Sequence, residues 1–444
     1  MKSKLRSLYV RLILSPGYRK FWRVLAETGR LLRFRRHVVK VFLQLDDPYS
    51  YLLSHYLRIV AANYKVELRI YLSQALRSEF MPQPAMLAEY AVRDCQQLAS
   101  ELGIEFLDRG DNPVVEYRRP LLDFLAEEQG QDDFAETMHD ALALYWRGDA
   151  EGAAKLVGHL QPERAETNVL VARNQLLLRK LGHYNSAMML YAGEWYWGVD
   201  RLLYLCTRLD SLRARRGKDA VAELASLRQV SQPNLPAAVP ASAQKLPALE
   251  MFHSFRSPYS YLALQRTFDI ADAFGVKLDI RPVLPMVVRG LKVPGKKLLY
   301  IVKDASREAK RLAVPFGKFC DPLGKGTERC IAVFYYAKSE DKEREFALSA
   351  GRAIWAEGID VASDEGMRTV TERAGLFWPD VVTAMNDESW RETVQTNRDA
   401  LTEVGLWGVP DFIIGDLALW GQDRDWLLAR QLEDMCLDTD GFLV

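Results

Sequence analysis

Cysteine is scarce in this chain, and its spacing does not suit redox chemistry. Five cysteines occur among 444 residues, and no two of them form a CxxC pair. Cycling between a dithiol and a disulfide needs two neighbouring cysteines, so the sequence disfavours a disulfide oxidoreductase. Scattered cysteines without metal-ligand spacing are typical of reduced thiols, from which we expect a cytoplasmic location.

Histidine clusters and long apolar runs are also missing. The six histidines form no HxH or HExxH motif, so we expect no metal site. Near the N-terminus, arginines interrupt the apolar residues every few positions. A secretory h-region and a membrane span both need longer uninterrupted runs, about 20 residues for a span. We therefore expect neither of them.

Negative charge is nearly absent from the start of the chain. The net charge is zero, but residues 1–40 contain twelve Lys or Arg and one acidic residue, Glu27. Two interpretations of an arm at residues 1–36 stay open. It is a basic amphipathic helix on an anionic membrane surface or an acidic partner, or it is an extension that folds back on the acidic remainder of the protein. The first adds a peripheral membrane location to the cytoplasmic one.

What the chain does contain is an internal repeat. Asp-Pro-Tyr-Ser-Tyr at 47–51 returns as Ser-Pro-Tyr-Ser-Tyr at 257–261, at an offset of 210 residues. The same offset pairs Phe42 with Phe252, Pro84 with Pro294, Tyr90 with Tyr300 and Asp94 with Asp304. Later the offset becomes 223, which pairs Trp197-Gly198 with Trp420-Gly421. An ordered set of matches at two constant offsets predicts a tandem duplication.

The repeat predicts two domains of roughly 190 residues each. We expect a basic arm at 1–36, a degenerate domain at 37–228, a Pro/Ala-rich linker at 229–246 and a domain with the active site at 247–444. Either the chain is a monomer, in which one copy packs where a second subunit would otherwise sit, or it is a homodimer.

The second copy shows the order of elements most clearly. Residues 249–255 read as a strand, and a helix follows at Ser257-Pro258, since serine is a good N-cap and proline suits the first helical position. Residues 276–280 alternate as a second, parallel strand. Then come helical patterns over 295–400, a hairpin turning at Gly415-Asp416 and a final helix from Asp423. This order predicts an α/β thioredoxin fold with a helical insertion.

These residues resemble the 2-hydroxychromene-2-carboxylate isomerase and kappa-class glutathione transferase family, a DsbA-like branch of the thioredoxin superfamily. Ser-Pro-Tyr-Ser-Tyr at 257–261, Gly-Val-Pro at 408–410 and Gly-Gln-Asp-Arg at 421–424 carry the resemblance. It covers nearly all of 247–435 and, in weakened form, about 38–226. It implies two tandem DsbA-like domains and a glutathione-dependent isomerase or transferase of an aromatic or hydrophobic electrophile. We expect reduced glutathione and a small aromatic substrate as ligands, and no nucleic acid.

The resemblance also implies roles for individual residues. Ser257 and Ser260 occupy the positions of a redox CxxC at the start of the helix, where the helix dipole stabilises a thiolate. Ser257 is implied as the catalytic residue that hydrogen-bonds the glutathione sulfur, although it also suits a plain N-cap. The implied glutathione-binding residues are Pro258, Val409, Pro410, Gln422, Asp423 and Arg424. The implied substrate-binding residues are Tyr259, Lys296, Lys297 and Trp407.

Some of these roles have plainer alternatives. By analogy, Val409 pairs its backbone with the cysteinyl part of glutathione beside a cis-proline, but a trans-proline opening an edge strand also fits the sequence. Asp423 meets the α-amino group of glutathione and Gln422 its carboxylate, or Asp423 is an N-cap. Lys296, Lys297 and Arg289 attract a carboxylate or form a solvated basic face. The family's usual Asn is missing from the loop at 286–294.

The first copy lacks several residues of this set. Asp47 replaces Ser257, Ala187 replaces Pro410 and Val199 replaces Gln422, while Met86 and Leu87 replace the two lysines. Like charges 4 Å apart repel by about 4 kcal/mol at an effective dielectric of 20, so a carboxylate at 47 opposes a thiolate there. We expect this copy to keep the fold without the chemistry. An alternative function leaves both copies non-catalytic, as a peptide-binding or membrane-peripheral adaptor.

Overall fold

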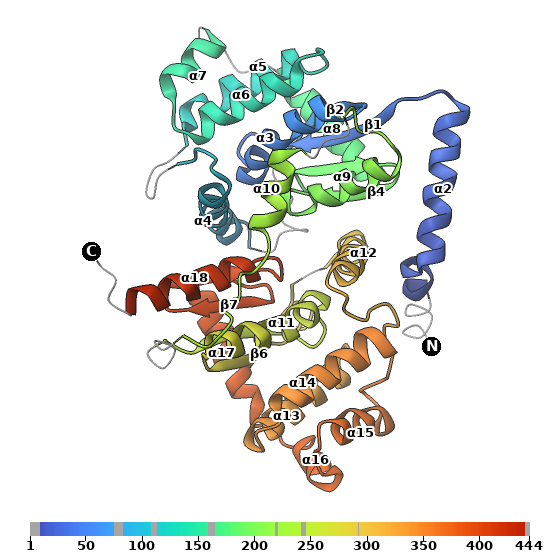
Figure 1. The fold of residues 1–444 in the computed structure, drawn as a ribbon, viewed down its shortest axis with the longest axis vertical. Helices are drawn as coiled ribbons and strands as arrows, with labels where there is room; N and C mark the ends of the chain where they lie inside the picture. Colours follow the sequence, from blue (N-terminus) through green and yellow to red (C-terminus); the bar gives the residue numbers. More distant parts are fainter. Residues whose placement is uncertain are drawn as a thin grey trace. The chain divides into compact units, whose positions relative to one another are not determined.

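The computed structural model describes residues 9–74, 83–107, 113–158, 165–217, 221–240, 246–291 and 293–439. Residues 1–8 of the expected arm, residues 241–245 near the end of the expected linker and the last five residues lie outside the described residues. The chain divides into two compact units: an N-terminal unit at 21–231, and a C-terminal unit at 232–444 that also includes 1–20 (Figure 1). The expected arm is thus shared between the two units.

A four-stranded mixed sheet organises the C-terminal unit. β5 (Leu249–His253) pairs in parallel with β6 (Leu278–Pro282) and antiparallel with β7 (Asp411–Ile414), and β8 (Leu417–Trp420) pairs antiparallel with β7. The strand order is therefore β6-β5-β7-β8. The hairpin turns at Gly415-Asp416, as predicted.

Helices connect and follow these strands. α11 (Pro258–Phe274) links the two parallel strands, and α18 (Asp425–Thr439) ends the described chain. The helical insertion before the hairpin consists of α12 (Gly295–Arg311), α13 (Lys325–Ser339), α14 (Glu343–Arg352), a π-helix (Ala353–Glu357), α15 (Asp364–Arg373), α16 (Trp378–Ala384) and α17 (Trp390–Glu403). The last helix begins two residues later than the sequence suggested. The predicted thioredoxin order with its helical insertion is confirmed for this unit.

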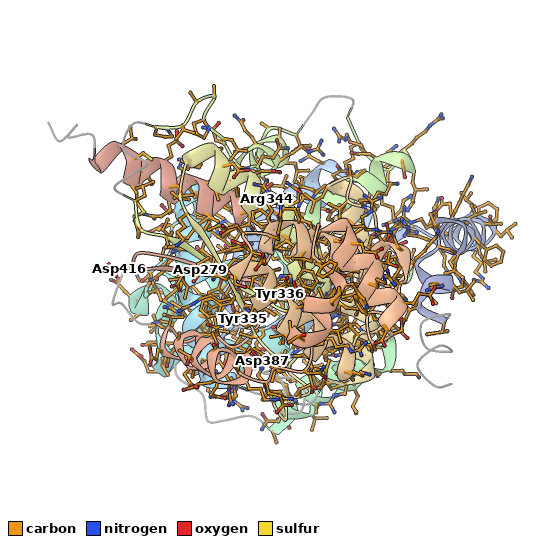
Figure 2. The ribbon with its side chains drawn as sticks, turned by 90° about the horizontal axis from the view of Figure 1, so that it is seen from below. Asp279, Tyr335, Tyr336, Arg344, Asp387 and Asp416 are labelled. Atoms are coloured by element: carbon orange, nitrogen blue, oxygen red, sulfur yellow. The ribbon has the colours of Figure 1, made fainter. Side chains whose placement is uncertain are left out.

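The insertion is tied to the sheet and to the start of α11. Asn397 of α17 donates to the carbonyl of Pro282 (3.0 Å) and to the hydroxyl of Tyr335 (3.1 Å). Tyr335 of α13 and Asp279 of β6 are labelled in Figure 2. Burial raises the pKa of the Tyr335 hydroxyl to about 12. Trp355 donates from its indole nitrogen to the carbonyl of Phe255 (3.3 Å). The insertion therefore supports the backbone that leads directly into Ser257.

The N-terminal unit has a second sheet with the equivalent order, β2-β1-β3-β4. Its strands are β1 (His37–Leu43), β2 (Val66–Leu72), β3 (Met188–Tyr191) and β4 (Glu194–Trp197). The helices are α2 (Pro16–Leu32), α3 (Pro48–Asn63), α4 (Pro84–Leu102), α5 (Arg118–Glu128), α6 (Phe134–Trp146), α7 (Ala150–Val157), α8 (Ala165–Leu181), α9 (Leu202–Ser211) and α10 (Ala222–Val230), with short 3-10 turns at Val115–Tyr117 and Val199–Arg201. None of the helices in the described ranges is long and apolar enough to cross a bilayer.

Candidate functional site

Ser257 lies at the junction of β5 and α11. Its backbone is extended (φ −92°, ψ 118°), and its Oγ accepts a hydrogen bond from the amide of Ser260 (3.1 Å), which makes it the N-cap. Pro258 is buried at the first position of the helix, where its missing N–H costs nothing. The Ser257 hydroxyl also donates to the carbonyl of Val409 (3.2 Å). The fold thus joins two predicted site residues that are 152 positions apart in the sequence.

The loop that carries Val409 is held tightly on both sides. The Val409–Pro410 peptide bond is cis, as the resemblance implied. A side chain at position 408 would bring its Cβ to 2.4 Å from the indole of Trp420, so only glycine fits there. The amide of Gly421 donates to the carbonyl of Pro410 (2.9 Å). These contacts hold the Val409 backbone against the N-terminus of α11.

Trp407 and Arg289 anchor the same loop from the other end. Trp407 is buried, with its ring centroid 4.7 Å from that of Trp420. Its carbonyl accepts a hydrogen bond from Nη2 of Arg289 (2.7 Å). The sequence left open whether Arg289 attracts a carboxylate or belongs to a solvated basic face, and in the structure its guanidinium is directed to the protein backbone. Burial lowers the pKa of Arg289, and the nearby charge of Asp411 acts in the opposite direction by raising it.

Asp411, directly after Pro410, was not predicted as a functional residue. Its side chain is fully buried, and neither carboxyl oxygen has a hydrogen-bond partner among the described residues. Burial raises the pKa of Asp411 well above its usual range, and the nearby Arg289 works in the opposite direction. The sequence showed that an acid follows Gly-Val-Pro, but it gave no sign that this acid is buried at the start of β7.

Gln422 is bound within the protein. Its amide nitrogen donates to Glu308 of α12 (2.9 Å), and its amide oxygen accepts from Arg266 of α11 (3.1 Å). Arg266 also forms an ion pair with Asp425 in the first turn of α18. The side chain of Gln422 is buried, and both its amide nitrogen and its amide oxygen are hydrogen-bonded to the protein. Through these bonds and the Arg266–Asp425 ion pair, it connects α11, α12 and the start of α18.

The two charged residues before α18 differ in exposure. Arg424 is buried, and its Nη1 lies 3.3 Å from the carbonyl oxygen of Asp423. The carboxylate of Asp423 is partly exposed and lies over Gly421, where a Cβ would come within 2.7 Å of it. Asp423 therefore has a partly exposed carboxylate that also pairs with Arg424 (3.7 Å), whereas the side chain of Arg424 lies in the interior.

Three of the four expected substrate-binding residues lie on α11 and α12, and the fourth, Trp407, lies in the loop before β7. The hydroxyl of Tyr259 donates to Asp304 (2.9 Å), whose other oxygen lies 3.4 Å from Arg307. Lys296 is exposed in the first turn of α12, while Lys297 is partly buried and burial lowers its pKa. No group of three or more His, Cys, Asp or Glu side chains suited to a metal occurs in the described ranges.

The equivalent position in the N-terminal unit is closed by its own hydrogen bonds. Asp47 caps α3 by accepting from the amide of Tyr49 (3.3 Å) and the hydroxyl of Ser50 (2.7 Å). Burial raises the pKa of Asp47 to about 6, against the hydrogen bonds from Ser50 and Ser186. Ala187, with φ 51°, stands where the sequence aligns Pro410. Asp47 caps α3 and is hydrogen-bonded by Ser50 and by Ser186 of the facing loop. It therefore provides no hydroxyl donor for a thiolate at this position.

A known protein family matches the C-terminal half of the chain. Residues 248–433 match the model of the DsbA-like thioredoxin domain family. The C-terminal half of the chain is a DsbA-like thioredoxin domain. The family resemblance expected from the sequence is confirmed.

Two curated relatives and one solved structure are similar to part of this chain. 2-Hydroxychromene-2-carboxylate isomerase of Pseudomonas putida is 28% identical over 200 residues, covering 42% of this chain and 95% of that protein. Glutathione S-transferase kappa 1 of Rattus norvegicus is 24% identical over 203 residues, covering 41% and 90%. A solved 2-hydroxychromene-2-carboxylate isomerase superposes with a TM-score of 0.40 at 24% identity, covering 45% of this chain and all of the other.

Proposed function

We propose that the DsbA-like domain is a glutathione-dependent isomerase or transferase, and that its substrate is an aromatic or hydrophobic electrophile like those of the isomerases it resembles. One observation carries the proposal: the Ser257 hydroxyl caps α11 and lies 3.2 Å from the carbonyl of Val409. A thiol peptide paired with the Val409 backbone would present its sulfur to that hydroxyl and to the positive end of the helix dipole.

The residues around Ser257 fit glutathione in three respects. The backbone of Val409 offers an amide and a carbonyl for the cysteinyl residue, in the short antiparallel pairing that peptides make with an edge. The partly exposed carboxylate of Asp423 suits the α-amino group. The exposed Lys296 suits a terminal carboxylate. Gln422 and Arg424 are better assigned to positioning, because their side chains are buried within the domain.

Ser257 has two tasks in this proposal. It keeps its acceptor bond from the Ser260 amide, which stabilises α11 by about 1 kcal/mol. Its O–H turns from the Val409 carbonyl toward the sulfur, where it stabilises negative charge. Bound glutathione would supply a thiolate nucleophile, whose ordinary thiol pKa of about 8.5 has to fall by one to two units to be ionised near neutral pH.

We further propose that the N-terminal unit is a degenerate copy of the same fold, produced by tandem duplication. The two units repeat the same hydrogen bonds at the offsets of 210 and 223. Tyr51 donates to the carbonyl of Glu105 (2.7 Å), as Tyr261 does to the carbonyl of Pro315 (2.8 Å). Tyr49 donates to the carboxylate of Asp94 (2.8 Å), as Tyr259 does to that of Asp304 (2.9 Å). Asn174 donates to the carbonyl of Leu72 (3.1 Å), as Asn397 does to that of Pro282 (3.0 Å).

An ion pair beside the site supports the same conclusion. Arg256 precedes Ser257 and pairs with Asp321 (2.8 Å). Asp46 precedes Asp47 and pairs with Arg118 (2.7 Å), so in both units the residue before the cap forms an ion pair, with opposite charge at that position. We propose residues 37–228 as the degenerate domain, 229–246 as the linker and 247–444 as the catalytic domain.

Calorimetric titration of the full chain with reduced glutathione tests the function. We expect binding that Val409→Pro abolishes, because proline removes the N–H that pairs with the peptide. The ultraviolet absorbance of the bound thiolate should fall in Ser257→Ala and not in Asp47→Ala, which removes the equivalent cap of the other unit. Absence of glutathione binding by the intact protein, or a thiolate signal unchanged in Ser257→Ala, would refute the proposal.

A further inference from the structure

The apolar side chains of α2 point outward. No residue of this helix is buried. Six large apolar residues lie along it at spacings of three, four and seven, which places them on one face of a helix. Their exposed fractions are 61% for Phe21, 49% for Trp22, 57% for Val24, 49% for Leu25, 56% for Leu31 and 75% for Leu32. An amphipathic helix at a protein surface ordinarily turns this face toward the core.

The polar face of α2 makes the contacts with the rest of the N-terminal unit. Arg23 binds both carboxylate oxygens of Glu194 (2.7 and 2.8 Å), and the buried Arg208 binds the same carboxylate (2.8 Å). Glu27 pairs with Arg30 on the same side (2.6 Å). The hydrogen bond from Arg23 to Glu194 raises the pKa of Arg23, so this contact favours the charged state. Charge therefore holds the helix with its apolar face outward.

The charges around the exposed face indicate what covers it. Lys20, Arg33, Arg35 and Arg36 are exposed at the ends of α2 and just beyond it. The sole acidic residue among the first 36, Glu27, is engaged with Arg30 on the opposite face. An apolar face with basic residues at its ends complements anionic lipid headgroups over acyl chains. A second copy of the chain would bring two such basic segments together, which like-charge repulsion opposes.

Two aromatic positions agree with a lipid interface. Trp22 belongs to this face and its ring centroid lies 5.7 Å from that of Phe21, and tryptophan prefers the boundary between headgroups and acyl chains. Phe34 follows the helix and is 97% exposed. With 17 residues, α2 is about 25 Å long, enough to lie in the plane of a membrane rather than to cross it.

We propose that α2 and the segment to Arg36 dock on an anionic membrane surface, with the apolar face between the lipids and the basic residues at their phosphates. This surface is separate from the glutathione site and does not depend on it. A docked helix would hold the protein at a membrane where apolar electrophiles concentrate.

Vesicle co-sedimentation of the full chain tests the docking. The vesicles are phosphatidylcholine alone or phosphatidylcholine mixed with phosphatidylglycerol. We expect binding to the mixture, weakened by salt. The double variant Trp22→Ser/Leu25→Ser should lose at least tenfold in partitioning. The matched control is Val169→Ser/Leu176→Ser on α8, where the side chains are 70% and 65% exposed, and it should bind as the parent protein does.

A charge series tests the second component. Each basic residue near an anionic surface contributes about fivefold to partitioning, so Arg33→Gln/Arg35→Gln/Arg36→Gln should lose about a hundredfold. The control Arg344→Gln/Arg352→Gln/Arg368→Gln removes three positive charges from surface ion pairs of the other unit and should lose little. Far-UV circular dichroism and thermal melts confirm that every variant is folded.

Three results would overturn the proposal. The first is no binding to anionic vesicles by the folded parent protein. The second is equal loss in the α2 variants and their controls. The third is a concentration-dependent dimer in analytical ultracentrifugation that Trp22→Ser/Leu25→Ser dissociates without any vesicle binding, which would assign the face to a second copy of the chain.

Discussion

Replacing Ser257 with aspartate separates the two tasks of this residue. Asp47 shows that aspartate caps the equivalent helix, where it accepts from the amide of Tyr49 and the hydroxyl of Ser50. Ser257→Asp should therefore keep the cap of α11, and its melting temperature should stay close to that of the parent protein. Ser257→Ala, which removes the acceptor of the Ser260 bond, should lose about 1 kcal/mol of unfolding free energy.

The effect of Ser257→Asp on bound glutathione should be much larger. A carboxylate and a thiolate 4 Å apart repel by about 4 kcal/mol at an effective dielectric of 20. That energy raises the thiol pKa by about 3, so the thiolate nearly disappears at neutral pH. Because burial raises the pKa of Asp47 to about 6, we expect the introduced acid to be neutral under mildly acidic conditions, where glutathione itself should still bind.

The assay is a pH titration of thiolate absorbance with glutathione bound to the parent protein, Ser257→Ala and Ser257→Asp. Asp47→Ser is the matched control, since it makes the reverse exchange in the other unit and should leave the titration unchanged. Melting curves of the same four proteins measure the cap. A bound thiol that titrates in Ser257→Asp as in the parent protein would show that the sulfur does not lie at this helix N-terminus.

Three further predictions concern the support of the site. Gly408→Ala places a Cβ at 2.4 Å from the indole of Trp420 and should lower the free energy of unfolding, measured by urea titration, by about 1–3 kcal/mol. The matched control Gly295→Ala, whose Cβ would have nothing within 4 Å, should change it little. Gln422→Leu removes the donor to buried Glu308 and should destabilise by about 1–3 kcal/mol; a stability equal to that of the parent protein would contradict the network. Asp47 has a pKa of about 6 in the folded state, above its ordinary value of 3.8, so the folded protein binds more protons than the unfolded chain between these pH values. The free energy of unfolding should therefore fall by about 2 kcal/mol as the pH rises from 3.8 to 6. Thermal melts of Asp47→Asn over the same pH range should lack this decrease.

Local signals in the sequence predicted the start of the site well. Ser257-Pro258 after a short strand is a cap followed by a proline at the first helical position, and both depend on neighbouring residues only. The hairpin at Gly415-Asp416 was predictable for the same reason. The strand and helix boundaries differ from the predicted ones by about two residues, because fraying ends are decided by tertiary contacts.

Contacts between distant residues were not predictable in this way. Gln422 was expected to face glutathione, but its amide binds Glu308, which is 114 positions away. The sequence left open whether Arg289 attracts a carboxylate, and in the structure it binds the carbonyl of Trp407, 118 positions away. A polar residue in a motif shows that a hydrogen bond is needed, and only the fold shows whether a ligand or the protein supplies the partner.

By itself, the sequence determined the order of strands and helices in the DsbA-like domain, the absence of a CxxC and the capping residue at position 257. It left open whether the basic arm at residues 1–36 forms an amphipathic helix. The tertiary structure decided that Ser257 meets Val409 and that α2 turns its polar face inward, toward Glu194. The physical reason is range: caps and periodicity act within a few residues, whereas a partly buried carboxylate such as Glu194 determines which face a helix presents only after the chain has folded.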